Sequence, residues 1–239
     1  MTADNNNNNN SRASESIQLS EAFPALMRKV YLWMAFALLI TAGVAYLTAA
    51  TPVMTSTIIT NRILFFGLLI TEVLLVVCIS AALDRLTLTH ATLLFVIYAA
   101  INGITMSVIL LAYTETSVAT VFLITAGTFG IMSLWGYTTA TDLSSLGKLL
   151  WMALIGLILA TIVNLFLHSG TLMLVLSYIG VIVFVGLTAY DTQKIKMMLM
   201  EAEEESEDYQ KLALMGALSL YLDFINLFIY LLRILGSRK

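Results

Sequence analysis

Seven long stretches of apolar residues follow one another along the chain, and polar connections separate them. They cover residues 30–50, 63–83, 91–113, 118–137, 149–167, 172–190 and 212–235. A helix of about 20 apolar residues is long enough to cross the hydrocarbon core of a bilayer. The pattern therefore predicts an all-α integral membrane protein, with seven transmembrane helices embedded in lipid within a domain of residues 23–239.

Composition supports a membrane protein and separates the N-terminus from the rest. Hydrophobic residues make up 59% of the chain and charged residues 11%, against about 45–50% and about 25% in soluble proteins. Residues 1–22 are polar and include an asparagine run at residues 5–10, so we expect a disordered tail that has nothing to bury. No basic region is interleaved with aromatic residues, so nucleic acid is not a predicted partner.

Basic residues predict the orientation in the membrane, because cytoplasmic loops are enriched in Lys and Arg. If all seven stretches span, one side carries eight basic residues: Arg12, Arg28, Lys29, Arg85, Lys148, Lys194, Lys196 and Lys211. The other side carries four: Arg62, Arg233, Arg238 and Lys239. We therefore expect the N-terminus in the cytoplasm and the C-terminus outside.

The last apolar stretch has an acid, Asp223, near its middle. Residues three, four and seven apart share one face of a helix, and those that share the face of Asp223 include Gly216, Ser219, Asn226 and Tyr230. An ionised carboxylate at the bilayer centre costs roughly 2.5–3.5 kcal/mol or more, so this face cannot contact lipid. We therefore predict that the other six helices surround the C-terminal helix, and that one of them supplies a partner for Asp223.

Two further acids are candidates for a role inside the membrane. Asp191 follows the sixth stretch. It is either a solvated acid at a helix end or a partner of Asp223, in which case the two carboxyls titrate as one unit. Glu72 lies in the middle of the second stretch, and is either hydrogen-bonded to a neighbouring helix or a second acid on an ion path. Arg85 ends that stretch, and either extends toward the interface or reaches an interior carboxylate.

Amides and glycines within the apolar stretches predict contacts between helices. The amides of Asn102 and Asn164 are expected to form interhelical hydrogen bonds. Gly127, Gly130 and Gly136 are expected to let a neighbouring helix approach closely.

Several segments together resemble the transmembrane Bax inhibitor motif family, and its bacterial members most. The segments are ALSLYLDFINLFIYLLR at residues 217–233, YDTQKI at 190–195, TDLSSLG at 141–147, NGIT at 102–105 and TEV at 71–73. The resemblance covers the whole chain after the tail. It implies a seven-helix bundle with the C-terminal helix at the centre and six helices around it.

The resemblance also implies a function, which is a pH-sensitive calcium leak in the bacterial inner (plasma) membrane. The aspartates that match Asp191 and Asp223 share a proton near the cytoplasmic face and sense pH. The acid that matches Glu72 lies on the permeation path, and an arginine in the place of Arg85 acts as a latch by pairing with the aspartate that matches Asp191.

Calcium as the permeant ion, with no other cofactor, agrees with the oxygen donors available. A firm calcium site takes six to eight oxygens at about 2.3–2.6 Å. Asp191, Asp223 and Glu72, helped by Ser219, Asn226 or water, supply fewer. We therefore expect weak, transient calcium binding at Asp191 and Asp223, because an ion that binds too firmly cannot leave.

Two alternatives belong to other functional classes. Aspartyl intramembrane proteases have an aspartate in a Gly-x-Gly-Asp motif followed by Pro-Ala-Leu. Here Ser-Leu-Tyr-Leu precedes Asp223, and the prolines are Pro24 and Pro52, so we predict that the protein is not an enzyme. The other alternative is a regulator without transport activity, whose tail at residues 1–22 binds a membrane-anchored ATP-dependent protease.

Overall fold

The computed structural model describes residues 27–201 and 207–239. An N-terminal helix, Met27–Ala49, comes first. It is followed by α2 (Pro52–Thr60), α3 (Arg62–Ala82), the short 3₁₀ helix η1 (Leu83–Arg85), α4 (Leu88–Leu111), α5 (Glu115–Thr138), α6 (Ser144–Leu167), α7 (Gly170–Glu201) and α8 (Glu207–Leu235). In this described part of the chain, 7 helices are long and apolar enough to cross a membrane, which confirms the predicted fold class. The tail predicted at residues 1–22 lies outside the described residues.

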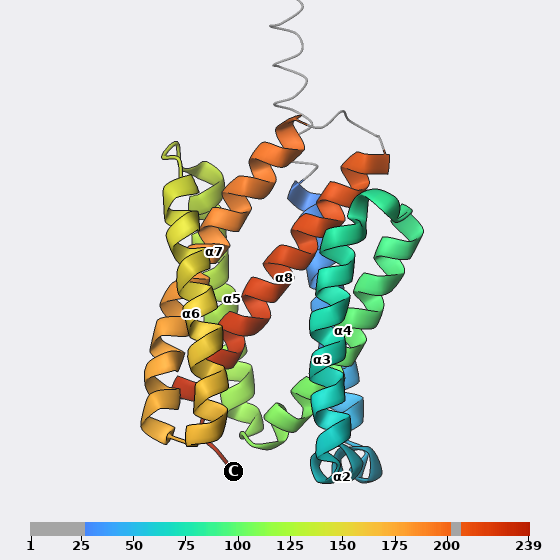
Figure 1. Cartoon of the computed structure of the whole chain (residues 1–239), viewed down its shortest axis with the longest axis vertical. Helices are drawn as coiled ribbons and strands as arrows, with labels where there is room; N and C mark the ends of the chain where they lie inside the picture. The colour runs from blue at the N-terminus through green and yellow to red at the C-terminus, as the bar shows by residue number, and fades with distance from the viewer. Residues whose placement is uncertain (1–26, 202–206) are drawn as a thin grey trace, which may run out of the picture.

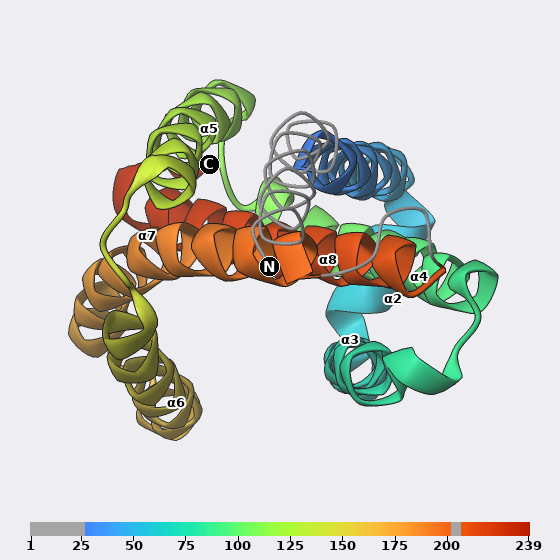
Figure 2. The same ribbon diagram turned by 90° about the horizontal axis from the view of Figure 1, so that it is seen from above.

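The central position of α8 is also confirmed. In the most apolar 18-residue window of α8, 67% of the residues are buried, against 6% in the corresponding window of α3. Figure 2 shows α8 running through the middle of the molecule, with α5 and α6 toward one end and α3, α4 and the N-terminal helix toward the other. Helices α4, α5 and α7 contact α8 directly, whereas α3 packs on α4 and α6 packs on α7. The peripheral helices leave large apolar side chains exposed, as lipid contact requires.

Capping residues decide where several helices begin. Thr87 accepts a hydrogen bond from the backbone amide of His90, and Thr114 accepts one from that of Ser117. Each satisfies an amide that would otherwise lack a partner at the first turn of a helix. Helices α4 and α5 therefore begin at residues 88 and 115, a turn before the apolar stretches predicted at 91 and 118.

Helix α7 is longer than the predicted stretch at residues 172–190, because it continues to Glu201 and contains 32 residues. The predicted end marked a fall in hydropathy at Lys194 and Lys196. Lysine is nevertheless a good helix former, so the helix continues past both residues. Asp191 is therefore an internal residue of α7 and does not lie at a helix end.

The short helix α2 was not predicted. It begins with Pro52, which suits the first turn of a helix because its missing amide hydrogen is not needed there. Figure 1 shows α2 nearly end-on at the end of the molecule opposite the α7–α8 connection, so it lies across the direction of the long helices. Its 9 residues are too few to span a bilayer.

Residues 236–239 fold back onto the turn between α4 and α5. The amide of Thr114 donates to the carbonyl of Ser237 at 3.0 Å, and the amide of Lys239 donates to the carbonyl of Ala112 at 3.1 Å. These two hydrogen bonds fix the end of α8 to the turn between its neighbours, at the same end of the molecule as α2 (Figure 1).

Candidate functional site

Helices α7 and α8 bring the two predicted aspartates together. Asp191 and Asp223 are 6% and 4% exposed. The hydroxyl of Ser219, one turn from Asp223 on α8, donates to Oδ2 of Asp191 at 2.5 Å. Asp191 also acts electrostatically on Asp223. Of the two readings left open for Asp191, the geometry matches the one in which it neighbours Asp223, and their role in pH sensing stays a prediction.

Asp223 has an unusual environment for a carboxyl group. Its Oδ2 atom is buried and has no hydrogen-bond partner among the described residues. A buried polar atom without a partner costs roughly 1–3 kcal/mol, and more when it carries charge. Asp223 is therefore the carboxyl in this part of the bundle that most lacks a partner among the described residues.

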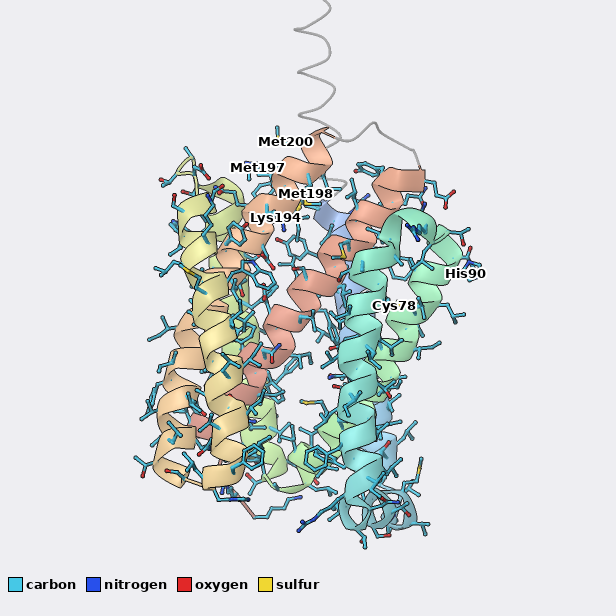
Figure 3. All side chains as sticks on the ribbon, viewed as in Figure 1. Cys78, His90, Lys194, Met197, Met198 and Met200 are labelled. Atoms are coloured by element: carbon cyan, nitrogen blue, oxygen red, sulfur yellow. The ribbon has the colours of Figure 1, made fainter. Side chains whose placement is uncertain are left out.

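A cavity of about 80 Å³ lies between α7 and α8 beside Asp191. Asp191, Lys194 and Ser219 form its polar wall, and Met198 and Met215 are among its apolar lining residues. Figure 3 shows Lys194 and Met198 on the side of α7 that faces α8, near the α7–α8 connection. The cavity therefore places Asp191, Lys194 and Ser219 on one wall of a mostly apolar space at this end of the molecule.

Two glycines let the neighbouring helices approach α7 around Asp191. A Cβ atom on Gly136 of α5 would collide with the backbone of Ala189. A Cβ atom on Gly216 of α8 would lie 2.9 Å from Cγ2 of Ile195. Both spacings are closer than real Cβ contacts. At Gly136 the neighbour is backbone, so α5 reaches its position beside α7 because this residue is glycine, whereas at Gly216 the Ile195 side chain would have to shift.

Two smaller predictions of helix contact are wrong. Gly127 and Gly130 have no neighbouring atom within 4 Å of an added Cβ, because both lie on the exposed face of α5. The amide of Asn164 does not bridge two packed helices. Its Oδ1 accepts from the backbone amide of Ser169 at 3.1 Å and closes the turn between α6 and α7, beside the positive φ of 50° at His168.

Gln193 fixes the turn between α5 and α6 to α7, and the sequence interpretation missed it. Its Oε1 accepts from the amide of Leu143 at 2.8 Å, and its Nε2 donates to the carbonyl of Thr141 at 2.8 Å. Lys196 adds a hydrogen bond to the carbonyl of Tyr137 at 2.9 Å. The signal was present in the sequence, since a glutamine two residues after Asp191 in an apolar helix must have buried partners.

Glu72 belongs to a second polar cluster. Its Oε1 accepts from the hydroxyl of Thr105 at 2.6 Å, and its Oε2 accepts from the amide of Asn102 at 3.3 Å. Oδ1 of Asn102 accepts in turn from the hydroxyl of Tyr221 on α8 at 3.0 Å. The interhelical hydrogen bonds predicted for Asn102 are confirmed. Glu72 is therefore connected to α8 through one amide, on a different face of that helix from Ser219.

The remaining predicted residues lie as follows. The amide of Asn226 donates to the carbonyl of Leu222 in its own helix at 2.8 Å. Arg85 is exposed in η1, and it forms no ion pair with Asp191 within the described part of the chain. Lys194 is the basic residue that acts electrostatically on Asp191 in this conformation. The role of Arg85 as a latch stays a prediction.

Comparisons with known proteins agree over the whole described length. The sequence model of the family described as inhibitor of apoptosis-promoting Bax1 matches residues 24–239. Inner membrane protein YbhL of Escherichia coli is 47% identical over 229 residues, which cover 95% of this chain and 98% of that protein. A protein of Rickettsia prowazekii is 44% identical over 230 residues, 95% of each chain, and one of Borreliella burgdorferi is 43% identical over 213 residues, 89% of this chain and 92% of that one.

Proposed function

The chain belongs to the Bax1 inhibitor family, also called the transmembrane Bax inhibitor motif family, and on that premise we propose that it is a pH-sensitive, calcium-permeable leak. One observation carries the proposal. Two buried carboxyls, Asp191 and Asp223, interact electrostatically; the first lines a cavity between α7 and α8, and Ser219 joins it to the helix of the second.

Competition between protons and calcium would make the leak depend on pH. Two carboxyls that share a site do not ionise independently, so the pair takes up protons in coupled steps. The ionised pair attracts a cation to the cavity, and the protonated pair does not. Protonation of Asp191 would also change its hydrogen bond with Ser219. The proposed leak is therefore controlled by the charge of the pair and by the contact between α7 and α8.

The available donors suit passage better than storage. Asp191, Asp223 and Ser219 offer fewer than the six to eight oxygens of a firm calcium site. A weakly bound ion leaves readily, which a conducting path requires. In this proposal Glu72, held by Asn102 and Thr105, is a further acidic station on the path.

The proposal includes a location and an orientation. The relative from Escherichia coli is named an inner membrane protein, and we propose the same membrane here. The excess of basic residues near the α7–α8 connection favours the cytoplasm for that end, which would make the cavity beside Asp191 a cytoplasmic entrance. A C-terminal fusion to alkaline phosphatase should then be active in cells, whereas a C-terminal fusion to green fluorescent protein should be dark.

Calcium flux into proteoliposomes that contain a calcium-sensitive dye tests the function directly. We expect flux that changes with pH and that Asp191→Asn and Asp223→Asn both alter. Glu115→Gln is the matched control, because Glu115 is an exposed acid in the first turn of α5. Flux equal to that of empty liposomes from about pH 5 to pH 8, the range in which such coupled groups switch, would refute the leak.

Two further measurements separate the leak from the other functional classes. A leak has no proteolytic activity, so incubation with single-pass membrane substrates should leave them intact. Deletion of residues 1–22 should leave calcium flux unchanged. A cellular phenotype that is lost on this deletion while flux persists would instead favour a regulator that binds a membrane-anchored protease.

A further inference from the structure

The hydroxyl of Tyr221 lies in the interior between two other polar side chains. Tyr221 is 0% exposed, and its ring packs edge-on against Phe95 and Tyr98 of α4 at centroid distances of 5.9 and 5.7 Å. Its hydroxyl oxygen is 2.6 Å from Oγ1 of Thr41 in the N-terminal helix and 3.0 Å from Oδ1 of Asn102 in α4. One atom on α8 therefore connects two other helices.

The hydroxyls of Thr41 and Tyr221 have fewer hydrogens to donate than they have acceptors within hydrogen-bond distance. Oγ1 of Thr41 also lies 2.9 Å from the carbonyl oxygen of Ala99 and 3.0 Å from that of Ala37, and each hydroxyl has one hydrogen to donate. In one arrangement Thr41 donates to Tyr221, and Tyr221 donates to Asn102. In the other, Thr41 donates to the carbonyl of Ala99 or of Ala37, Tyr221 donates to Thr41, and Asn102 loses its donor. The Tyr221 hydroxyl can thus point to either neighbour, and because both neighbours belong to other helices, the position of α8 sets its distance to each.

Asn102 carries this choice to Glu72. Its Oδ1 accepts from Tyr221, and its Nδ2 donates to Oε2 of Glu72 at 3.3 Å. When Tyr221 donates, the amide plane is held at both ends. When the Tyr221 hydroxyl donates to Thr41 instead, the Asn102 side chain is held only through Glu72. Thr105 is then the only one of the two donors to Glu72 whose own position is fixed by another contact.

We propose that Tyr221 and Asn102 are positioning residues that set the orientation of the Glu72 carboxyl according to the position of α8. The inference takes from the proposed function only that Glu72 lies on the ion path. Tyr221 follows Ser219 by two residues on the same helix, so a displacement of α8 at the contact between Ser219 and Asp191 reaches Glu72 through Asn102. The two polar clusters would then respond together although they lie on different faces of α8.

Infrared spectroscopy of the full-length protein in lipid tests the inference without any ion gradient. The carboxyl and carboxylate stretching bands of Glu72 are identified by their loss in Glu72→Gln. Tyr221→Phe removes the hydroxyl and keeps the ring, so the Glu72 band should shift and broaden. Tyr113→Phe is the control: it removes the same group from another buried ring, one that forms no hydrogen bond with Glu72 within the described part of the chain, and should leave the band unchanged.

Thr41→Val provides the opposite change. Without Thr41 as a hydrogen-bond partner, the Tyr221 hydroxyl retains Asn102 as its acceptor. The Glu72 band should then keep its position and become narrower, which distinguishes loss of the hydrogen bond from general loosening of the core. This variant also tests the inference if Tyr221→Phe does not fold, because a Thr41→Val band as broad as that of the unchanged protein would overturn it.

A double-mutant cycle tests the link to α8. Ser219→Ala should shift the Glu72 band in the otherwise unchanged protein and should shift it much less when Tyr221→Phe is also present. A Glu72 band that is identical in Tyr221→Phe and Tyr113→Phe would overturn the inference. Because the bands are read without flux, failure of the leak proposal leaves this result standing, and a leak with unchanged bands would refute only the positioning role.

Discussion

Ser219 of α8 donates a hydrogen bond of 2.5 Å to Asp191 of α7, one helical turn before Asp223. The bond joins the central helix to a neighbour through a group that can gain or lose charge. A change in the protonation of Asp191 therefore changes a contact between two helices as well as the charge at the cavity. A substitution at Ser219 therefore removes the contact between α7 and α8 while it leaves both carboxyls, Asp191 and Asp223, in the protein.

Ser219→Ala should move the pH dependence of calcium flux. Without the hydroxyl, the ionised Asp191 loses a hydrogen-bond donor, so protons should compete with calcium at higher pH. Hydrogen bonds to charged groups are worth about 1.5–3 kcal/mol, so we expect the flux midpoint to rise by about one pH unit or more. Ser177→Ala is the control, because its hydroxyl bonds only the Met173 carbonyl of its own helix among the described residues. Equal midpoints in both variants would contradict the assigned contact.

Gln193→Glu should loosen the turn between α5 and α6. The substitution keeps the size of the side chain but replaces the amide that donates to the carbonyl of Thr141 with a second acceptor. An unpaired acceptor of this kind costs about 1–3 kcal/mol. Hydrogen exchange at residues 139–143 should become faster, and the melting temperature should fall. Gln210→Glu, at an exposed position of α8, should change neither. Unchanged slow hydrogen exchange at the turn in Gln193→Glu would show that the hydrogen bond from Gln193 to Thr141 does not hold the turn in place.

Gly136→Ala should destabilise the bundle, whereas Gly130→Ala should not. An added methyl group at Gly136 meets the backbone of Ala189, but one at Gly130 meets no atom within 4 Å. Overpacking costs about 1–3 kcal/mol, whereas replacing an uncrowded helical glycine with alanine gains about 0.5–1 kcal/mol. The melting temperatures of the two variants in detergent should therefore change in opposite directions. Shifts of the same sign would mean that α5 contacts α7 elsewhere.

Hydropathy and the cost of burying charge were sufficient to predict the main architecture. A spanning helix needs about 20 apolar residues whatever its neighbours, so the seven stretches could be located from sequence. Asp223 could not face lipid, so α8 had to be central. The ends of helices were less predictable, because caps such as Thr87 and helix formers such as Lys194 act independently of hydropathy.

The details of the site depended on helix rotation, which sequence spacing does not give. Tyr221 was missed because a two-residue step places it about 200° around the helix from Asp223, on a face that looked apolar. In a helix surrounded on all sides, that face also meets polar partners such as Asn102. The same limitation explains why Gly127 and Gly130 were mistaken for contact residues while Gly136 is one.

Glu207→Gln should lower stability at neutral pH and have no effect in acid. Glu207 lies before the apolar part of α8, where it accepts from the backbone amide of Leu88 at 3.0 Å and pairs with Lys211 at 3.4 Å. The Leu88 amide, followed by Lys211, holds the pKa of Glu207 below its usual range. A group whose pKa is lower in the folded state stabilises the fold above its unfolded pKa of about 4.3, and this stabilisation disappears as pH falls through the folded value.

The difference in melting temperature between the unchanged protein and Glu207→Gln should therefore shrink below about pH 4. Buried acids titrate in both proteins, so their effects cancel in this difference. A melting-temperature difference that stays constant from neutral to acid pH would show that Glu207 acts without its charge.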